Sequence, residues 1–83
     1  MLKSKWDNNK KVFLLFYQGE WLEVMSINQV YISDNWEIAN KSHVDITKKI
    51  EKVMIVLNKK LIELSKDQFS EAVLRWALEK FGK

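Results

Sequence analysis

The stretch VFLLFYQGEWLEVMSINQVYISDNWEI, residues 12–38, decides the fold of this 83-residue chain. Residues 12–17 are β-branched, aliphatic or aromatic, which is typical of a strand. Gln18-Gly19 predicts a tight turn, because glycine tolerates positive φ, and residues 20–27 then form the returning strand. Residues 30–33 predict a third strand, and residues 36–38 extend or close it after a bend at Asp34-Asn35. The stretch therefore predicts a three-stranded antiparallel sheet.

Both faces of this predicted sheet are apolar. If Gln18 and Gly19 form the loop, cross-strand pairing puts Phe13, Leu15, Leu22 and Val24 on one face, which we expect to be the core face. A sheet with one solvated face should alternate apolar and polar residues, yet only Glu23 interrupts the other face. Either helices cover both faces, or one face meets another chain. The residues of the second face that we expect at such an interface are Val12, Leu14, Phe16 and Met25.

Two helices are predicted to follow the sheet. Ser42-x-x-Asp45 resembles a capping box and predicts a helix over residues 43–64. The apolar residues with helical spacing, which form its core stripe, are Ile46, Ile50, Val53, Met54, Leu57, Leu61 and Leu64. Ile55 and Ile62 fall with Val44 on the exposed half of that helix, which predicts a second contact surface there.

The capping signature recurs at Ser65-Lys-Asp-Gln68 and predicts a second helix over residues 66–81. With no proline and no linker-like tract, residues 1–83 are expected to form a single domain. Residues 1–11 are a polar arm, extended or a short strand, whose tip frays unless Trp6 docks. The predicted fold class is α+β, a three-stranded antiparallel sheet followed by two helices in the order βββαα.

Composition argues against several classes of function. The chain has no cysteine, one histidine (His43) and two glycines, which disfavours thiolate metal sites, nucleophilic triads and phosphate-binding loops. The carboxylates available to pair for acid–base chemistry, Glu20, Glu23, Asp34 and Glu37, lack a pattern that places them in one cleft. We therefore expect a protein without catalytic residues, metal or cofactor. No apolar run reaches the length of a membrane span, so a cytoplasmic location is expected.

The net charge of +3 is unevenly distributed. Residues 1–11 carry a net charge of +3, residues 12–38 of −4 and residues 39–83 of +4. The lysines that line one side of the first predicted helix, Lys48, Lys52, Lys59 and Lys66, together with Lys3, Lys5, Lys10 and Lys11, favour nucleic-acid binding as an alternative function. Against it, Arg75 is the single arginine, and arginine is the residue that most often reads phosphates and bases.

Three of the four tryptophans, Trp6, Trp21 and Trp36, have acidic or asparagine neighbours and lie near turns or segment ends. Amphipathic rings in such positions suit a ligand pocket or a protein-interface hot spot. Trp76 belongs instead to the apolar row of the second predicted helix. We therefore expect a binding site for a ligand or partner that uses Trp6, Trp21, Trp36, Asp34, Lys3, Lys5 and Lys10.

Three short segments, ISDNWEI (residues 32–38), LKSKWDNN (2–9) and FSEAVLRWALEKFGK (69–83), carry a resemblance to known proteins. They are similar to the "ADDWEV" ending, the "TRKGWEDN" stretch and the first helix, "FNEAVKKALETGK", of a family of small phage proteins, the second family of Thoeris anti-defence sponges. The order is permuted, and the chain departs from the motif at Lys3 and Asn35, where the family has Arg and Asp. The resemblance implies sequestration of a cyclic ADP-ribose-type signal, with the tryptophans stacked on its base and the N-terminal lysines near its phosphates.

These observations support one leading hypothesis and two alternatives. The leading hypothesis is a non-enzymatic binding protein, phage- or mobile-element-encoded, that acts against host defence. It would sequester a nucleotide-type signal or block a protein surface, and would self-associate or bind a host protein. The alternative from another class is a lysine-driven nucleic-acid-binding protein that uses the first predicted helix and the N-terminal arm. A small hydrolase is a distant third possibility.

Overall fold

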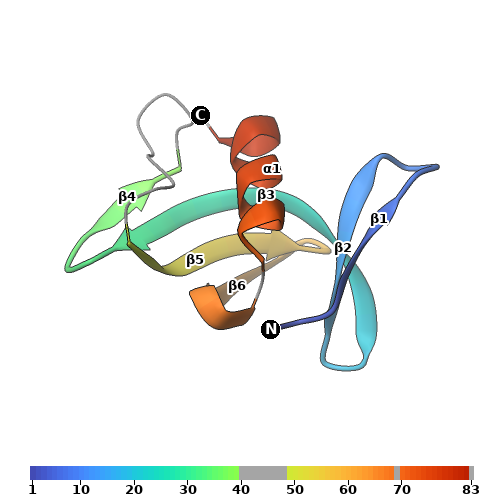
Figure 1. Cartoon of the computed structure of the whole chain (residues 1–83), viewed down its shortest axis with the longest axis horizontal. Helices are drawn as coiled ribbons and strands as arrows, with labels where there is room; N and C mark the ends of the chain where they lie inside the picture. Colours follow the sequence, from blue (N-terminus) through green and yellow to red (C-terminus); the bar gives the residue numbers. More distant parts are fainter. Residues whose placement is uncertain (40–48, 69, 83) are drawn as a thin grey trace.

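The computed structural model describes residues 1–39, 49–68 and 70–82, which form an antiparallel sheet and one α-helix. The strands are β1 (Ser4–Asp7), β2 (Val12–Tyr17), β3 (Glu20–Ile32), β4 (Trp36–Ile38), β5 (Ile50–Leu57) and β6 (Lys60–Ser65). A 3₁₀ turn, η1 (Lys66–Gln68), precedes the helix α1 (Glu71–Phe81). The order across the sheet is β1-β2-β3-β5-β6, with β4 paired to the end of β3 (Figure 1).

The predicted fold class, three strands followed by two helices, is wrong. Residues 50–64, which were predicted to be helical, lie in the β5–β6 hairpin. Its two loop residues, Asn58 and Lys59, both have positive φ (46° and 70°), as in the turns that favour two-residue hairpins. Residues 43–48 of the predicted helix lie outside the described residues.

The error at β5 and β6 has a definite cause. Spacings of three and four among the apolar residues between Ile50 and Leu64 fit a helical stripe, but residues 53, 55, 57, 62 and 64 also fit strand alternation. Ile55 and Ile62, which the helix left on its exposed half, are direct cross-strand partners on the covered face of the sheet. Leu61, which the helix placed in the core, is instead exposed.

The second predicted helix starts later than residue 66. The side chain of Gln68 accepts a hydrogen bond from the backbone N–H of Ser65 at 2.8 Å, so the Ser65–Gln68 signature is physically present but caps η1. Ser70 is the N-cap of α1, and its Oγ accepts from the N–H of Val73 at 3.3 Å. The predicted end of the helix at Phe81 is confirmed.

The predicted β2–β3 register is confirmed, with Leu15 opposite Leu22 and Phe16 opposite Trp21. The predicted end of the second strand at residue 27 is wrong, since β3 continues to Ile32. Asn28 and Gln29, which lay between the second and third predicted strands, are part of β3. Register shifts on β3, between Val24 and Ser26 and between Ile27 and Gln29, mark bulges, which bend a strand and increase its twist. One 13-residue strand therefore pairs with β2 and β4 along one edge and with β5 along the other.

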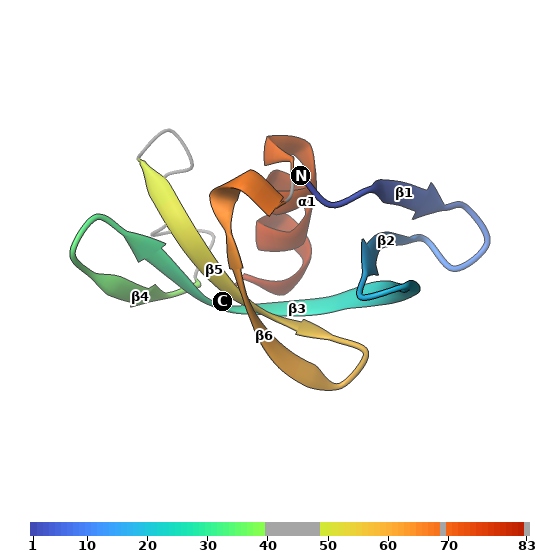
Figure 2. The ribbon, with the colours of Figure 1, turned by 90° about the horizontal axis from the view of Figure 1, so that it is seen from below.

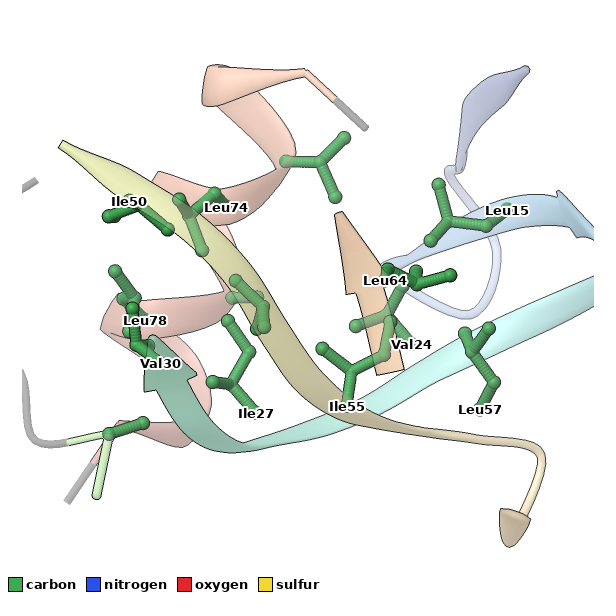
Figure 3. Packing of buried hydrophobic residues seen from close by; sticks show 14 of the residues in the cluster. Leu15, Val24, Ile27, Val30, Ile50, Ile55, Leu57, Leu64, Leu74 and Leu78 are labelled. Atoms are coloured by element: carbon green, nitrogen blue, oxygen red, sulfur yellow. The ribbon is translucent and has the colours of Figure 1, made fainter. Parts of the chain in front are cut away.

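The core lies between α1 and one face of the sheet (Figure 2). Side chains of β3, β5 and β6 gather beneath the helix, with Leu15 of β2 at one side of the group (Figure 3). Full burial of one such aliphatic side chain stabilises the fold by about 1.5–3 kcal/mol. The core also holds an apolar cavity of about 10 Å³ lined by residues that include Leu15, Ile27 and Ala77, which is too small for a ligand beyond a single water.

The N-terminal arm is a strand rather than a free segment. β1 pairs with β2, and Trp6 packs edge-on against Phe13 and Trp76 at centroid distances of 5.1 and 5.6 Å. In the turn that follows β1, the Asp7 carboxylate accepts hydrogen bonds from the N–H groups of Asn9 and Lys10, each at 3.0 Å. The N–H group of Lys10 is the largest cause that lowers the pKa of Asp7 below its ordinary value of 3.8.

The β5–β6 turn gives the first test of the fold. Lys59→Gly should raise the free energy of unfolding by about 0.5–1 kcal/mol, because glycine adopts positive φ without steric cost. In a helix spanning the same residues, this substitution would lower stability by a similar amount. Urea denaturation of both proteins measures the difference.

The matched control is Lys60→Gly one residue further on, in β6. There glycine weakens a regular strand, so stability should fall by about 0.5–1 kcal/mol. A loss of stability in both variants would contradict the hairpin.

The β1–β2 turn gives a second test. Because the pKa of Asp7 is lowered in the folded state, ionised Asp7 stabilises the fold at pH values above 3.8, and this stabilisation is lost as pH falls through the lowered value. Asp7→Asn keeps an acceptor oxygen but cannot ionise. Urea midpoints measured from pH 6 down to pH 2, a range chosen to span the carboxylate titration, should fall less steeply for the variant. Parallel pH profiles would show that the turn does not use the charge of Asp7.

Candidate binding surface on the open sheet face

The sheet has one face turned away from α1, which we call the open face. No helix within residues 1–39, 49–68 and 70–82 covers it (Figure 2). Strand register and burial place ten apolar side chains there, exposed or half-buried: Val12, Leu14, Phe16, Trp21, Met25, Tyr31, Trp36, Ile38, Met54 and Leu61, with Val56 beside them. The covered face is buried against α1, whereas the open face carries charged side chains such as Lys5, Lys52 and Glu63 among its apolar ones.

One end of the open face, over β1, β2 and the start of β3, combines aromatic rings with lysines. We call Phe16, Trp21, Lys3, Lys5 and Lys10 the aromatic–lysine patch. The Phe16 and Trp21 rings meet edge to face with centroids 5.2 Å apart, and Trp21 is 39% exposed. Lys5 Nζ lies 4.3 Å from the Trp21 ring centroid, a cation–π contact that contributes about 0.5–1 kcal/mol at an exposed position.

Two further lysines flank these rings. The carbonyl of Lys3 accepts a hydrogen bond from the Phe16 N–H at 2.9 Å, which fixes the backbone of Lys3 beside β2. Lys10 Nζ lies 3.3 Å from Oε1 of Glu23, whose strand partner is Leu14. An exposed ion pair of this kind contributes little, so Lys10 can turn to another anion at small cost. Two acids, Glu23 and Asp7, lie beside the three lysines, so the patch keeps an excess of one positive charge.

The rest of the open face is mainly apolar. We call Met25, Trp36, Ile38, Met54, Val56 and Leu61 the apolar patch. Ile38 is 69% exposed and Leu61 55%, both high values for aliphatic side chains. Lys52 and Glu63, on the same face, form an ion pair at 3.6 Å across β5 and β6. Register also places Ser26 and Gln29 among these residues, so the patch is apolar surface interrupted by two neutral polar side chains and bordered by the Lys52–Glu63 pair.

Met25 ties this patch to the neighbouring hairpin. Its Sδ accepts a hydrogen bond from the Lys59 N–H at 3.1 Å, at a bulge of β3. At the other end of β3, the Tyr31 and Trp36 rings lie 5.0 Å apart, and the Asp34 N–H donates to the Tyr31 hydroxyl at 3.0 Å. These contacts hold the exposed side chains in place on the sheet.

The three tryptophans predicted to share a site lie in three separate places. Trp6 is on the helix side of the sheet, in contact with Phe13 and Trp76. Trp21 and Trp36 are on the open face, but Trp36 pairs with Tyr31, ten residues along β3 from Trp21. At about 3.3 Å per residue, roughly 30 Å of strand separates them. One small ligand cannot contact all three rings in a single chain.

The predicted interface residues divide by face. Val12, Leu14, Phe16 and Met25 lie on the open face, as the alternation of β2 and the start of β3 predicts. Ile55 is 3% exposed, and Ile62 is half-buried against the core, so their predicted role as an exposed contact surface is wrong. That role depended on a helix over residues 43–64. The open-face residues that sequence reasoning missed are Tyr31, Ile38, Met54, Val56 and Leu61, and strand alternation on either side of Asn58-Lys59 is the signal that identifies the last three.

The predicted line of lysines on the first helix does not exist as a surface. Lys52 lies in β5, Lys59 in the β5–β6 turn and Lys66 in η1, whereas Lys48 and the lone His43 lie outside the described residues. Across the part of the chain that the structure describes, no three His, Cys, Asp or Glu side chains group as metal ligands would. No described helix is long and apolar enough to cross a membrane. Among the described lysines, Lys5 contacts the Trp21 ring and Lys10 the neighbouring Glu23, which places both at the aromatic–lysine patch.

Comparison with known proteins adds no family to this description. No family model matches the chain, and no match was found among curated proteins or solved structures. The chemistry of the open face is therefore the basis for the function proposed below.

Proposed function

We propose that the chain is a non-enzymatic binding protein that acts by holding another protein surface on its apolar patch. The observation that carries the proposal is the exposure of Ile38 and Leu61 on a sheet face that α1 does not cover. Contiguous exposed apolar surface on a small soluble domain is characteristic of interaction sites. Burial of such a surface releases water and stabilises a complex.

The patch has the features of an interface centre. Trp36 offers a large, half-exposed ring held by Tyr31, and a ring that is already fixed loses little conformational entropy on binding. Met25 and Met54 add adaptable apolar side chains. The Lys52–Glu63 pair fits the polar rim that surrounds most interfaces.

A second copy of the chain is the first partner to test, since a small domain with a large apolar face gains stability from self-association. The resemblance of residues 2–9 and 32–38 to Thoeris anti-defence sponges extends the proposal to a role against host defence in the cytoplasm. The separation of the tryptophans favours the blocking of a protein surface over the stacking of all three rings on one nucleotide.

The test is a double substitution, Ile38→Lys with Leu61→Lys, which places two charges in the apolar patch. Both side chains are exposed in the single chain, so the fold should keep its thermal midpoint. Sedimentation or light scattering over a micromolar concentration series should show self-association of the unaltered protein. Loss of two exposed apolar contacts, one on β4 and one on β6, should weaken it by about 30-fold or more.

Glu79→Lys on the exposed side of α1 is the control for added positive charge, and it should leave self-association unchanged. A protein that remains monomeric at high micromolar concentration, with a cooperative unfolding transition, would contradict the second copy as the partner. Equal weakening by Glu79→Lys would contradict the apolar patch as the interface.

A further inference from the structure

We propose that the aromatic–lysine patch binds single-stranded nucleic acid, with a base stacked on Trp21 and phosphates held by Lys3, Lys5 and Lys10. This site lies at the opposite end of the open face from Trp36 and shares no residue with the apolar patch. It therefore stands independently of the protein-binding function proposed above.

The Trp21 ring is held in a position where a base can stack on it. The edge-to-face contact with Phe16, at 5.2 Å, fixes the Trp21 ring while leaving 39% of the residue exposed on the open face. Lys5 Nζ sits 4.3 Å from the ring centroid, in the space that a base would take. Base stacking on an aromatic ring is stronger than an exposed cation–π contact, so a base can displace the lysine. The displaced ammonium group stays within reach of a backbone phosphate of the same nucleotide.

The charge around the ring favours a polyanion. Lys3 and Lys5 form no ion pair among the described residues, and Lys10 forms an exposed pair with Glu23. The carboxylate of Asp7 attracts Lys10 and Lys5 without forming a close ion pair with either, so all three ammonium groups stay available to phosphates. All three lysines belong to residues 1–11, which carry a net charge of +3. A single-stranded nucleic acid that crosses β1 and β2 would pass these lysines in turn. Each neutralised phosphate releases counterions, which favours binding at low salt.

The shape of the site selects the ligand. Trp21 and Phe16 lie on an open sheet surface, and neither lines the cavity in the core, whereas tight binding of a free nucleotide usually needs an enclosing pocket. A duplex keeps its bases stacked on one another, and Arg75, the single arginine, lies on α1 rather than on the open face. A single strand offers unstacked bases together with several phosphates, which matches an exposed ring among lysines.

The experiment measures fluorescence anisotropy of a labelled oligothymidylate about 15 nucleotides long, close to the upper end of known single-strand site sizes. The full chain should bind it, and affinity should fall as salt rises from ~50 to ~200 mM. Trp21→Leu should weaken binding about 10-fold to 100-fold, whereas Trp21→Phe, which keeps an aromatic face, should retain most of it. Thermal midpoints of both variants verify that the fold is intact.

The second part of the test replaces two lysines at once and has a matched control. Lys3→Gln with Lys5→Gln should lower the slope of log affinity against log salt by about 1.4, as expected for two lost contacts with a single strand. Lys66→Gln with Lys80→Gln, which removes the same charge from exposed positions outside the patch, should leave the slope unchanged. Both pairs lie on the surface, so they stay informative even if Trp21→Leu fails to fold.

Three results would overturn the proposal. The first is no binding of the oligothymidylate at ~50 mM salt. The second is equal weakening by the two lysine pairs, which would indicate attraction by net charge alone. The third concerns Trp21→Leu: if this variant loses self-association but binds the oligothymidylate with unchanged affinity, the ring belongs to a protein interface. Ile38→Lys with Leu61→Lys should keep nucleic-acid binding, so failure of either proposal is distinguishable from failure of the other.

Discussion

The structure depends on the burial of one face of β3 and β5 beneath α1. An 11-residue helix is the only α-helix among the described residues, and its buried side chains, Val73, Leu74, Ala77 and Leu78, face a single side of the sheet. Strand alternation puts every second residue on the opposite side, where the described chain supplies nothing to cover it. Because residues 12–17 are apolar on both faces, the fold that buries one face leaves apolar side chains on the other. The open face is thus a consequence of how the core is made.

Part of this fold could be predicted from the sequence. Gln18-Gly19 sets the β2–β3 turn and its register, because both residues adopt positive φ and the loop length fixes the pairing. The β5–β6 hairpin could not be separated from a helix by apolar spacing alone, since residues 50–64 satisfy both periods. Two observations favoured strands: Ile55 and Ile62 had no place in the helical core, and Asn58 lies between two runs that alternate.

The candidate site was predictable only near the β2–β3 turn. Val12, Leu14 and Phe16 were assigned to one face correctly, because β2 is regular and its alternation is unbroken. Along β3, two bulges break that alternation, so Ile27 is buried where strict alternation from Val24 would turn it outward. The face of Trp21 follows from the β2–β3 turn, but the place of Trp6 depends on the pairing of β1 with β2, and that of Trp36 on the bulges of β3 and its pairing with β4. Neither the bulges nor the long-range pairing can be read from local sequence, which is why Trp6, Trp21 and Trp36 were grouped although they lie apart.

Leu61 and Leu64 provide the most direct test of an open and a covered face. They are three residues apart in β6, one 55% exposed on the open face and the other fully buried beneath α1, whereas a helix would bury both in one stripe. Trypsin releases them in one peptide, residues 61–66, so hydroxyl-radical labelling at low micromolar concentration gives their relative oxidation within a single fragment. The structure predicts strong oxidation of Leu61 and little of Leu64. Equal protection of the two leucines would contradict it.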